Sequence, residues 1–350
     1  MQTTLTEANV FDYLRDRYPP AAGRDGAAGS CAPAGDGNIN WVRRVRAGGR
    51  SFVVKQAGPA LEKFPEYAVS PERILHEARY YRAVAPFDEA GICPAVHFVD
   101  PESHVMVLED LGEAERLDAA LRRGADATEA LCRIARFLGR VHAGTRDPEA
   151  LAPFPDPASD DGVLRLHLEH IFRLPFEAND FPLSIALRAE AERLSADAAF
   201  RGRVAAVESA SRRCVALIHG DVQPTNVLLA SRGAVLLDAE IAHGGAPSFD
   251  LGLLLGHIVL ACAAAGRAAD AAERVAPIWR AYVEAHAGAA PCRFCEVAAV
   301  AGVEMLRRTL GAARVPEVSD DAVAREGVRV GESLVREPPE EPSALRRLGR

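Results

Sequence analysis

The segment Leu217–Gly252, LIHGDVQPTNVLLASRGAVLLDAEIAHGGAPSFDLG, constrains the fold of this chain most strongly, because it sets acidic and amide side chains between short apolar runs. Residues 216–218 predict the end of a buried strand, and HGDVQPTN, with its internal proline, predicts a loop. NVLLA and AVLLD predict two strands that are joined at SRG. This hairpin would bring Asp238 back beside Asp221 and Asn226.

Oxygen-bearing side chains at one end of a hairpin suit phosphoryl transfer. Magnesium prefers hard oxygen ligands and usually binds one or two carboxylates together with substrate phosphates. The reaction also needs a carboxylate that orients the attacking hydroxyl and accepts its proton. Solvated turns and helix caps would account for Asp250 or Asn226 singly, but they account poorly for Asp221, Asn226 and Asp238 all bracketing one hairpin.

Lysine is scarce in this chain, since only Lys55 and Lys63 of the 41 basic residues are lysines. Arginine does not replace lysine where a compact ammonium must touch a phosphate. Lys63, in ALEKFPEY, is interpreted as an ordinary surface residue. The segment GDGNINWVRRVRAGGRSFVVK predicts a β-hairpin with a glycine-rich tip and with Lys55 on its second strand.

A helix is predicted about twenty residues after Lys55, in SPERILHEARYYRAVAP. Ser70 would cap it, Pro71 would occupy its first position, and apolar residues follow at helical spacing. Glu77 lies on this helix. A strand lysine followed by a helix glutamate is the pattern by which kinases hold a lysine against nucleotide phosphates. By itself the pattern is weak, because many proteins contain it.

Composition narrows the class of protein. With 350 residues, 49% of them hydrophobic, the chain is long enough for a large core or two adjoining lobes. The formal charge of −8 argues against nucleic acid as a partner, because that binding depends on clustered Lys and Arg. The seven cysteines suggest reduced thiols, and the pair Cys292 and Cys295 lacks the second ligand pair that zinc would need. No signal peptide or uncharged membrane-spanning run is recognised, so we expect a cytoplasmic protein with no membrane partner.

The motif HGDVQPTN, followed by LLDAE and SFDLG, resembles the catalytic core of the aminoglycoside phosphotransferase and choline kinase superfamily. Within it the chain most resembles the 5-methylthioribose kinases, through LTEANVFDYL, GDGNINWVRRV, VVKQA, VMVLEDLGE and EMLRRTLGAARV. The likeness covers nearly the whole chain, and HGD with DAE is its most specific part. It implies an α+β, bilobal, protein-kinase-like fold. An N-terminal antiparallel β-sheet lobe with one key helix would precede a larger, mainly α-helical C-terminal lobe that carries the catalytic hairpin.

We expect residues 1–110 to form a nucleotide-binding lobe and residues 111–330 to form a catalytic and acceptor-binding lobe. An insert that opens with GTRDPEALAPFPDPASDDG and ends near Phe200 would shape the acceptor site. Residues 331–350 are charged and Pro-rich and predict a disordered tail. The stretch from Ala22 to Ala34, rich in Gly, Ala and Pro, predicts an insertion or a disordered loop.

The resemblance also implies a nucleotide site for ATP or GTP. Lys55 would contact the α and β phosphates, and Glu77 would orient it. Backbone amides of a loop would cover the phosphates, as glycine-rich loops allow. The loop residues are Gly35, Asp36, Gly37 and Asn38, and the connector residues whose backbone would bind adenine are Glu109 and Leu111.

The same resemblance assigns the catalytic end. Asp221 would be the catalytic base, and Asp250 would brace the catalytic loop, with His219 packed beneath it rather than reacting. The implied cofactor is Mg²⁺. Its predicted ligands are Asn226, Asp238 and Glu240, the last for either the metal or the substrate.

The acceptor is predicted to be small. Only twelve positions separate Asp238 from Asp250, too few for a segment that grips a peptide, and HRD is absent. A polycationic aminoglycoside would need a carboxylate-lined pocket, whereas the predicted helix EVAAVAGVEMLRRTLGAAR presents Arg307 and Arg308. Adjacent helical residues point about 100° apart, so we expect one arginine to bind acceptor hydroxyls and the other to be solvated.

The sequence therefore predicts a magnesium- and ATP- or GTP-dependent kinase that phosphorylates a sugar hydroxyl, with 5-methylthioribose as the best single acceptor. An antibiotic-inactivating phosphotransferase, acting on a nucleoside-like or glycosylated drug, is the alternative. A kinase-fold binding protein without turnover is disfavoured, because Lys55, Asp221, Asn226 and Asp238 are all present. The choice of nucleotide, the hydroxyl that reacts, and assembly into a homodimer stay open.

Overall fold

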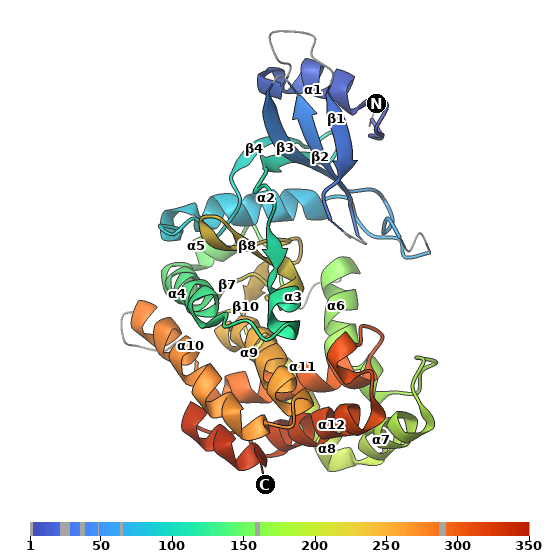
Figure 1. Ribbon diagram of the computed structural model, residues 1–350, viewed down its shortest axis with the longest axis vertical. Helices are drawn as coiled ribbons and strands as arrows, with labels where there is room; N and C mark the ends of the chain where they lie inside the picture. The colour runs from blue at the N-terminus through green and yellow to red at the C-terminus, as the bar shows by residue number, and fades with distance from the viewer. Residues whose placement is uncertain are drawn as a thin grey trace. The chain divides into compact units, whose positions relative to one another are not determined.

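The computed structural model describes residues 3–21, 29–35, 39–47, 49–63, 66–157, 162–286 and 292–349. The chain divides into two compact units (Figure 1). Unit 1 contains Met1–Pro86, Cys93–Ala114 and Leu237–Ile241. Unit 2 contains Phe87–Ile92, Glu115–Leu236 and Ala242–Arg350. The short segment Leu237–Ile241, which carries Asp238 and Glu240, thus belongs to the N-terminal unit although it lies late in the sequence.

Unit 1 is built on a five-stranded antiparallel sheet with the strand order β1-β2-β3-β5-β4 (Figure 1). Its strands are β1 (Ser30–Pro33), β2 (Trp41–Ala47), β3 (Arg50–Gln56), β4 (Val96–Asp100) and β5 (Val105–Glu109). Its helices are α1 (Val10–Arg17) and α2 (Arg73–Val84), with short 3-10 turns η1 (Pro19–Ala21) and, across the unit boundary, η2 (Ala85–Phe87).

The two faces of this sheet carry different kinds of side chain. Side chains alternate along a strand, so Val54 and Lys55 on β3 point to opposite faces. Val54 joins Phe52 and Val107 in a buried core that includes residues of α1. Lys55 instead meets Glu77 of α2. One face therefore stabilises the unit, and the other presents a buried cation.

The predicted hairpin around Lys55 is confirmed, because β2 pairs with β3 from Trp41 opposite Gln56 to Ala47 opposite Arg50. The predicted helix is present but begins at Arg73 rather than Pro71. Ser70 Oγ accepts a hydrogen bond from the amide of Glu72 at 3.2 Å, which places a turn before the helix. Part of the stretch Ala22–Ala34 is not a disordered loop, because Ser30–Pro33 form edge strand β1; residues 22–28 lie outside the described residues.

Unit 2 is mainly helical, as predicted. Its helices are α3 (Leu117–Arg122), α4 (Thr128–Gly144), α5 (Pro148–Leu151), α6 (Gly162–Phe172), α7 (Ile185–Ala196), α8 (Ala198–Ser211), α9 (Pro247–Ala264), α10 (Ala271–Ala285), α11 (Phe294–Leu310) and α12 (Asp321–Arg336). Its 3-10 turns are η3 (Leu174–Phe176), η4 (Pro224–Asn226), η5 (Ala268–Asp270), η6 (Pro316–Val318) and η7 (Pro342–Gly349).

Two small sheets carry the catalytic stretch of unit 2. Strand β7 (Ala216–Ile218) pairs with β10 (His243–Gly245). The predicted hairpin is formed by β8 (Val227–Ala230) and β9 (Gly233–Leu236), and β6 (Glu115–Arg116) adds a third strand beside β8. The loop HGDVQPTN runs from the end of β7 to the start of β8, as the sequence predicted.

Helix α9 is the central helix of unit 2. Its 18 residues have a mean hydropathy of 1.6, so by length and composition it could cross a membrane. However, 83% of that stretch is buried inside the protein, as is common for the core helix of a globular domain. Helix α9 packs against α11 and α12, and its first turn carries Asp250.

The expectation that residues 331–350 are disordered is wrong for the described part of this segment. Helix α12 continues to Arg336, and the 3-10 turn η7 follows at Pro342–Gly349. Leu345 and Leu348 are buried, and η7 packs against α10. Two leucines three positions apart suffice to dock a short segment whose other residues are mostly charged or small.

Close packing of α9 on α11 requires glycine at two positions. A Cβ added at Gly252 would lie 2.4 Å from Val300 Cβ, and one at Gly256 would lie 2.9 Å from the carbonyl oxygen of Ala301. We therefore predict that Gly252→Ala lowers the free energy of unfolding by about 1 to 3 kcal/mol, the usual cost of overpacking a core. Urea denaturation followed by circular dichroism measures this change.

Gly202 of α8 is the matched control, because a Cβ added there would meet no atom within 4 Å. Gly202→Ala should leave stability unchanged or raise it by about 0.5 to 1 kcal/mol, since alanine suits a helix interior better than glycine. Equal effects of the two substitutions would show that the α9–α11 contact does not depend on Gly252.

Candidate active site

Lys55 is held by two carboxylates within unit 1. Its Nζ donates hydrogen bonds to Glu77 Oε2 at 2.6 Å and to Asp238 Oδ1 at 2.7 Å. Tyr81 donates to the other oxygen of Glu77 at 3.0 Å. Burial alone would lower the pKa of Lys55, but the carboxylates of Asp238, Glu77 and Glu240 outweigh burial and raise that pKa. The side chain is therefore a buried cation with a fixed position.

Asp238 differs from the other groups around Lys55 in two ways. Its φ is 62°, a left-handed backbone conformation that is uncommon outside glycine. Its side chain is 49% exposed, whereas that of Lys55 is only 4% exposed. This turn sets a solvent-accessible carboxylate beside a buried ammonium, an arrangement that suits a charged ligand arriving from solvent.

Glu240 belongs to a buried network. Its Oε2 accepts a hydrogen bond from Asn40 Nδ2 at 2.8 Å and lies 3.8 Å from Arg73 Nε. Arg73 donates in turn to Asn40 Oδ1 at 3.0 Å. Burial raises the pKa of Glu240 despite the opposing charge of Lys55. Glu240 therefore helps to fix neighbouring backbone, whatever else it binds.

Arg73 anchors the chain that follows the predicted nucleotide loop. Its guanidinium donates to four backbone carbonyls, those of Ile39, Gly58, Ala60 and Ser70. Gly35, at the start of that loop, has a φ of 137°, which glycine tolerates best. Asp36, Gly37 and Asn38 lie outside the described residues, so their predicted contact with phosphates stays a prediction.

The predicted adenine connector is held by its own side chains. The amide of Glu109 donates to the carbonyl of Ala95 at 2.9 Å, so it is not the group that adenine would use. The carboxylate of Asp110 accepts from Ser51 Oγ at 2.5 Å and from the amide of Gly112 at 3.0 Å. The carbonyl of Glu109 and the amide of Leu111 are then the atoms that the prediction requires.

In unit 2, Asp250 fixes the catalytic loop from below. Its two carboxylate oxygens accept from the amides of His219 and Gly220, both at 2.8 Å, and Oδ2 lies 3.2 Å from His142 Nε2. Burial would raise the pKa of Asp250, but these contacts outweigh burial and lower it. The buried ring of His219 lies beneath the loop, with Nδ1 at 3.2 Å from the amide of Asp221.

Asp221 has one oxygen engaged and one left open. Asn226 Nδ2 and Gln223 Nε2 each donate to Oδ2 at 2.8 Å. Among the described residues no partner is found for the buried Oδ1. Burial would raise the pKa of Asp221, but nearby cations, including Arg307 and Arg308, outweigh it and lower that pKa. The loop thus holds a carboxylate that stays ionised with one free oxygen.

The arginine pair of α11 is arranged differently from the prediction. Arg307 and Arg308 are both buried, so neither is solvated. Both donate to Glu304, Arg307 Nη1 at 3.1 Å and Arg308 Nε at 2.6 Å. Arg308 Nη2 also donates to Gln223 Oε1 at 2.5 Å, and Gln223 in turn contacts Asp221. One buried glutamate three and four positions before the pair explains how α11 hides both guanidinium groups.

The donor groups that were predicted for Mg²⁺ have suitable chemistry. Asn226 uses its amide nitrogen on Asp221, which leaves Oδ1 as the atom that a cation would take. Asp238 adds an exposed carboxylate, and both are hard oxygen ligands. Over the described ranges, no cluster of three or more His, Cys, Asp or Glu side chains could hold a metal ion. Asn226 and Asp238 belong to different units, so their predicted convergence stays a prediction.

Glu304, Arg73 and Gln223 are among the residues of these networks that the sequence did not predict. Glu304 could have been found, since it lies three and four positions before two arginines on a helix. Arg73 carried no signal, because most of its partners are backbone carbonyls in separate segments around residues 39, 58–60 and 70. Gln223 carried none either, because its role depends on the distant Arg308.

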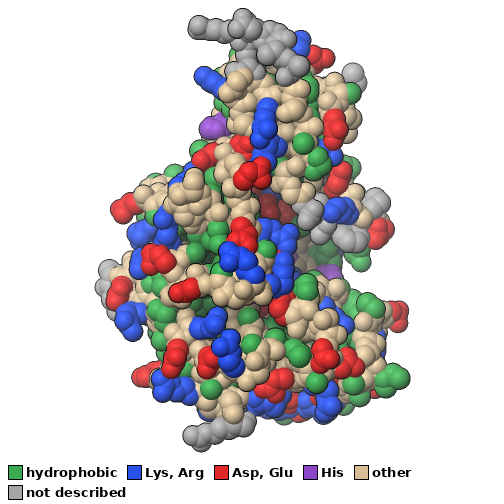
Figure 2. Space-filling model, viewed as in Figure 1, with side chains coloured by type: hydrophobic (Ala, Val, Ile, Leu, Met, Phe, Trp, Pro, Cys, Tyr) green, Lys and Arg blue, Asp and Glu red, His purple; other side chains and the backbone are tan. Residues whose placement is uncertain are grey.

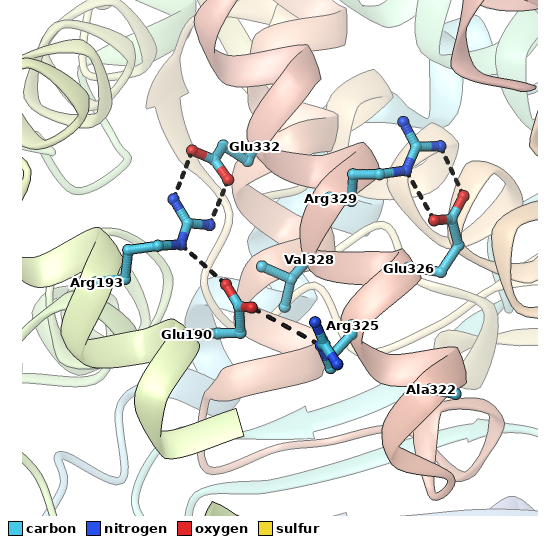
Figure 3. Close-up of a pocket in the computed structure, with 8 residues that line it drawn as sticks. All are labelled: Glu190, Arg193, Ala322, Arg325, Glu326, Val328, Arg329 and Glu332. Carbon is cyan, nitrogen blue, oxygen red and sulfur yellow. Dashed lines mark hydrogen bonds and ion pairs between the residues drawn. The ribbon is translucent and has the colours of Figure 1, made fainter. Parts of the chain in front are cut away.

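A groove of about 420 Å³ between α7 and α12 is lined by side chains that satisfy one another (Figure 3). Arg193 bridges Glu190 and Glu332, and Arg329 pairs with Glu326. Similar mixing of basic and acidic side chains covers the face drawn in Figure 2. Ion pairs of this exposed kind contribute about 0 to 1 kcal/mol each and indicate no ligand.

Comparison with known proteins assigns the family. Residues 30–293 match the family model described as Phosphotransferase enzyme family. A protein named methylthioribose kinase from Cronobacter sakazakii is 27% identical to this chain, over 83% of this chain and 82% of its own length. Another of that name, from Erwinia tasmaniensis, is 28% identical, over 86% of both chains.

The fold is similar to that of a choline/ethanolamine kinase family protein from Mesorhizobium loti. The TM-score is 0.52 at 20% identity, covering 92% of this chain and 94% of that one, and at this identity the likeness shows the fold alone. The α+β fold with an antiparallel sheet in one unit and helices in the other agrees with this kinase-like architecture. The chain belongs to the phosphotransferase enzyme family and is a kinase that phosphorylates an alcohol.

Proposed function

We propose that this protein is a cytoplasmic, ATP- or GTP-dependent sugar kinase whose acceptor is 5-methylthioribose. The observation that carries the proposal is the geometry of Asp221, which has Oδ2 fixed by two hydrogen bonds and a buried, unpartnered Oδ1. A carboxylate in that state is prepared to orient one hydroxyl and accept its proton. The choice of methylthioribose rests on relatives of that name that align over most of their length.

Unit 1 would hold the nucleotide. The ammonium of Lys55 would contact the α and β phosphates while Glu77 keeps it in place. The loop from Gly35 to Asn38 would cover the phosphates, and the connector would bind adenine through the carbonyl of Glu109 and the amide of Leu111. Asp238 would then exchange part of its contact with Lys55 for the bound ligand, since its carboxylate is half exposed.

Kinases of this kind take a nucleotide together with Mg²⁺. Bound Mg²⁺ would neutralise charge on the β and γ phosphates. Asn226, Asp238 and Glu240 are the residues of this chain that would hold it. Glu240 already accepts from Asn40, so its larger task is to keep Arg73 and the end of the nucleotide loop in position.

The transfer itself needs few protein groups. The acceptor oxygen forms a bond to the γ phosphorus as the bond from that phosphorus to the nucleoside diphosphate breaks. The hydroxyl proton passes to Asp221 Oδ1. Asp250 would keep the catalytic loop rigid during this step, because both of its oxygens bind backbone amides of that loop.

Of the two arginines, Arg307 is the one proposed to bind the acceptor. Arg308 is committed to Glu304, Gln223 and the carbonyl of Ala313. Arg307 has a buried Nε that lacks a partner among the described residues. A guanidinium at this place suits hydroxyl oxygens and repels ammonium groups, which disfavours polycationic antibiotics as acceptors.

The acceptor is tested by measuring ADP or GDP release with methylthioribose, nucleosides and antibiotics in parallel. The proposal expects methylthioribose to give the highest kcat/KM. Efficient turnover of an antibiotic, with methylthioribose inert, would replace it with the resistance-enzyme alternative. Nucleotide and acceptor binding without product would support the third reading, a binding protein.

Asp221→Asn is predicted to lower kcat by roughly a hundredfold or more, because it removes the proton acceptor without removing a phosphate contact. Nucleotide affinity, measured by calorimetry, should stay within about twofold. Asp321→Asn, at an exposed position in the first turn of α12, is the control and should match the wild type. A single-turnover rate near wild type for Asp221→Asn would rule out the assignment.

Lys55→Arg is predicted to lower kcat/KM by roughly a hundredfold, the scale expected when an electrostatic contact to developing charge is lost. A planar guanidinium cannot occupy the space of a compact ammonium between Glu77 and the phosphates. The only other lysine supplies the control, since Lys63→Arg changes an exposed side chain. If both variants are equally active, Lys55 is a structural residue.

Alanine substitutions of the two arginines should affect different kinetic constants. Arg307→Ala should raise the acceptor KM by about fivefold to a hundredfold, as for one lost hydrogen bond in a desolvated pocket, with nucleotide KM unchanged. Arg308→Ala should mainly lower kcat, because Gln223 would lose the contact that holds it against Asp221. The reverse pattern would exchange the two roles.

A further inference from the structure

Helix α6 carries His167, whose buried Nε2 the sequence did not single out. Asp221 Oδ1, Arg307 Nε and His167 Nε2 are among the buried polar atoms of unit 2 that have no hydrogen-bond partner in the described residues. They come from the catalytic loop, α11 and α6, and α6 packs against α11. His167 and Arg307 are near enough to Asp221 that a positive charge on either one would lower the pKa of its carboxyl.

Unpartnered atoms at this depth indicate a ligand. A buried donor or acceptor without a partner costs about 1 to 3 kcal/mol, and most such atoms in folded proteins are paired. Three in one place would be costly unless something that binds there satisfies them. The surrounding groups do not compete, since Arg308 and Gln223 are bound to each other.

The imidazole of His167 is held in place by packing. Its ring and that of Phe249 form a T-shaped pair, with ring centroids 6.3 Å apart and planes at 80°. Phe249 is buried and immediately precedes Asp250, which fixes the catalytic loop. The position of the ring is therefore tied to the same helix, α9, that positions Asp221.

The three atoms differ in what they can bind. Asp221 Oδ1 accepts a hydrogen bond, Arg307 Nε donates one, and a neutral imidazole nitrogen does either according to its tautomer. Burial lowers the pKa of His167 to about 4, so the ring is neutral near pH 7. A hydroxyl can serve all three, because it both donates and accepts.

We propose that His167 binds the acceptor through Nε2 and selects a neutral acceptor with a second hydroxyl beside the one that reacts. The reacting hydroxyl would donate to Asp221, and its neighbour would bridge Arg307 and His167. This inference rests on the proposed kinase function. It adds a specificity-determining residue from the insert between residues 145 and 200, and it names the acceptor class as a neutral polyol.

The test compares His167→Phe with the wild type in the ADP-release assay. Phenylalanine keeps a ring against Phe249 but removes the nitrogen, so acceptor KM should rise about fivefold to a hundredfold while nucleotide KM is unchanged. His167→Gln, whose amide reaches the place of Nε2, should recover most of the loss. His170→Asn, one turn later on α6, is the control and should leave acceptor KM unchanged.

A second measurement needs no variant. The 2-deoxy and 3-deoxy analogues of methylthioribose each remove one hydroxyl, and the wild-type enzyme should lose at least about fivefold in kcat/KM with one of them. His167→Phe should show no further loss with that same analogue. If neither analogue loses activity, or if His167→Phe keeps the wild-type acceptor KM, the inference is overturned.

The experiments distinguish an error in the role of His167 from an error in the proposed substrate. If methylthioribose is inert but another alcohol is phosphorylated, the proposed substrate is wrong, and His167→Phe is then assayed with that alcohol. An unchanged KM there overturns the role of His167, and a raised KM with intact nucleotide KM supports it.

Discussion

The buried carboxylate of Asp250 is the constraint on which the catalytic half of this protein depends. It accepts from two successive amides at the end of β7 and so couples the catalytic loop to the first turn of α9. The same helix approaches α11 closely at Gly252 and Gly256. Helix α9 therefore sets the distance between the loop that carries Asp221 and the helix that carries Arg307. A change in either contact would move Asp221 relative to Arg307.

Three groups of buried charges lie at or near the candidate active site. Lys55 with Glu77, Glu304 with its two arginines, and Asp250 with backbone amides are ionic groups that are almost completely removed from water. Such groups give little net stability when paired, yet removal of one partner costs about 3 to 5 kcal/mol because the other charge is left buried. Selection for stability alone would favour apolar replacements. In the proposed kinase the role of these ionic groups is to supply fixed charges around a phosphoryl group and a hydroxyl.

The sequence predicted what depends on local chain chemistry. The motif HGDVQPTN fixed the loop, both hairpins followed from alternation and glycine turns, and a strand lysine with a helix glutamate predicted the contact that Lys55 makes. It could not predict which arginine is engaged. The 100° offset between neighbours shows only that they diverge, whereas the outcome depends on Glu304 and on the distant Gln223.

Long-range packing accounts for the other differences. The docking of Leu345 on α10 is invisible in a charged, proline-rich tail, because two apolar residues suffice once a partner surface exists. His167 gave no signal for the same reason. It lies in an insert with no motif of its own, and only the fold sets its ring against Phe249.

The charge balance around Asp221 finally limits what the acceptor can be. Asp221 and Glu304 supply two negative charges near the two positive charges of Arg307 and Arg308. Burial lowers the pKa of the nearby His257 and His167, so neither ring adds charge. A cluster that is already neutral gains nothing from a charged acceptor, which would bring an uncompensated ion into a desolvated site. A neutral acceptor avoids that cost and can still satisfy each open donor and acceptor through its hydroxyls. The electrostatics of this cluster thus support the proposed neutral sugar over a cationic drug.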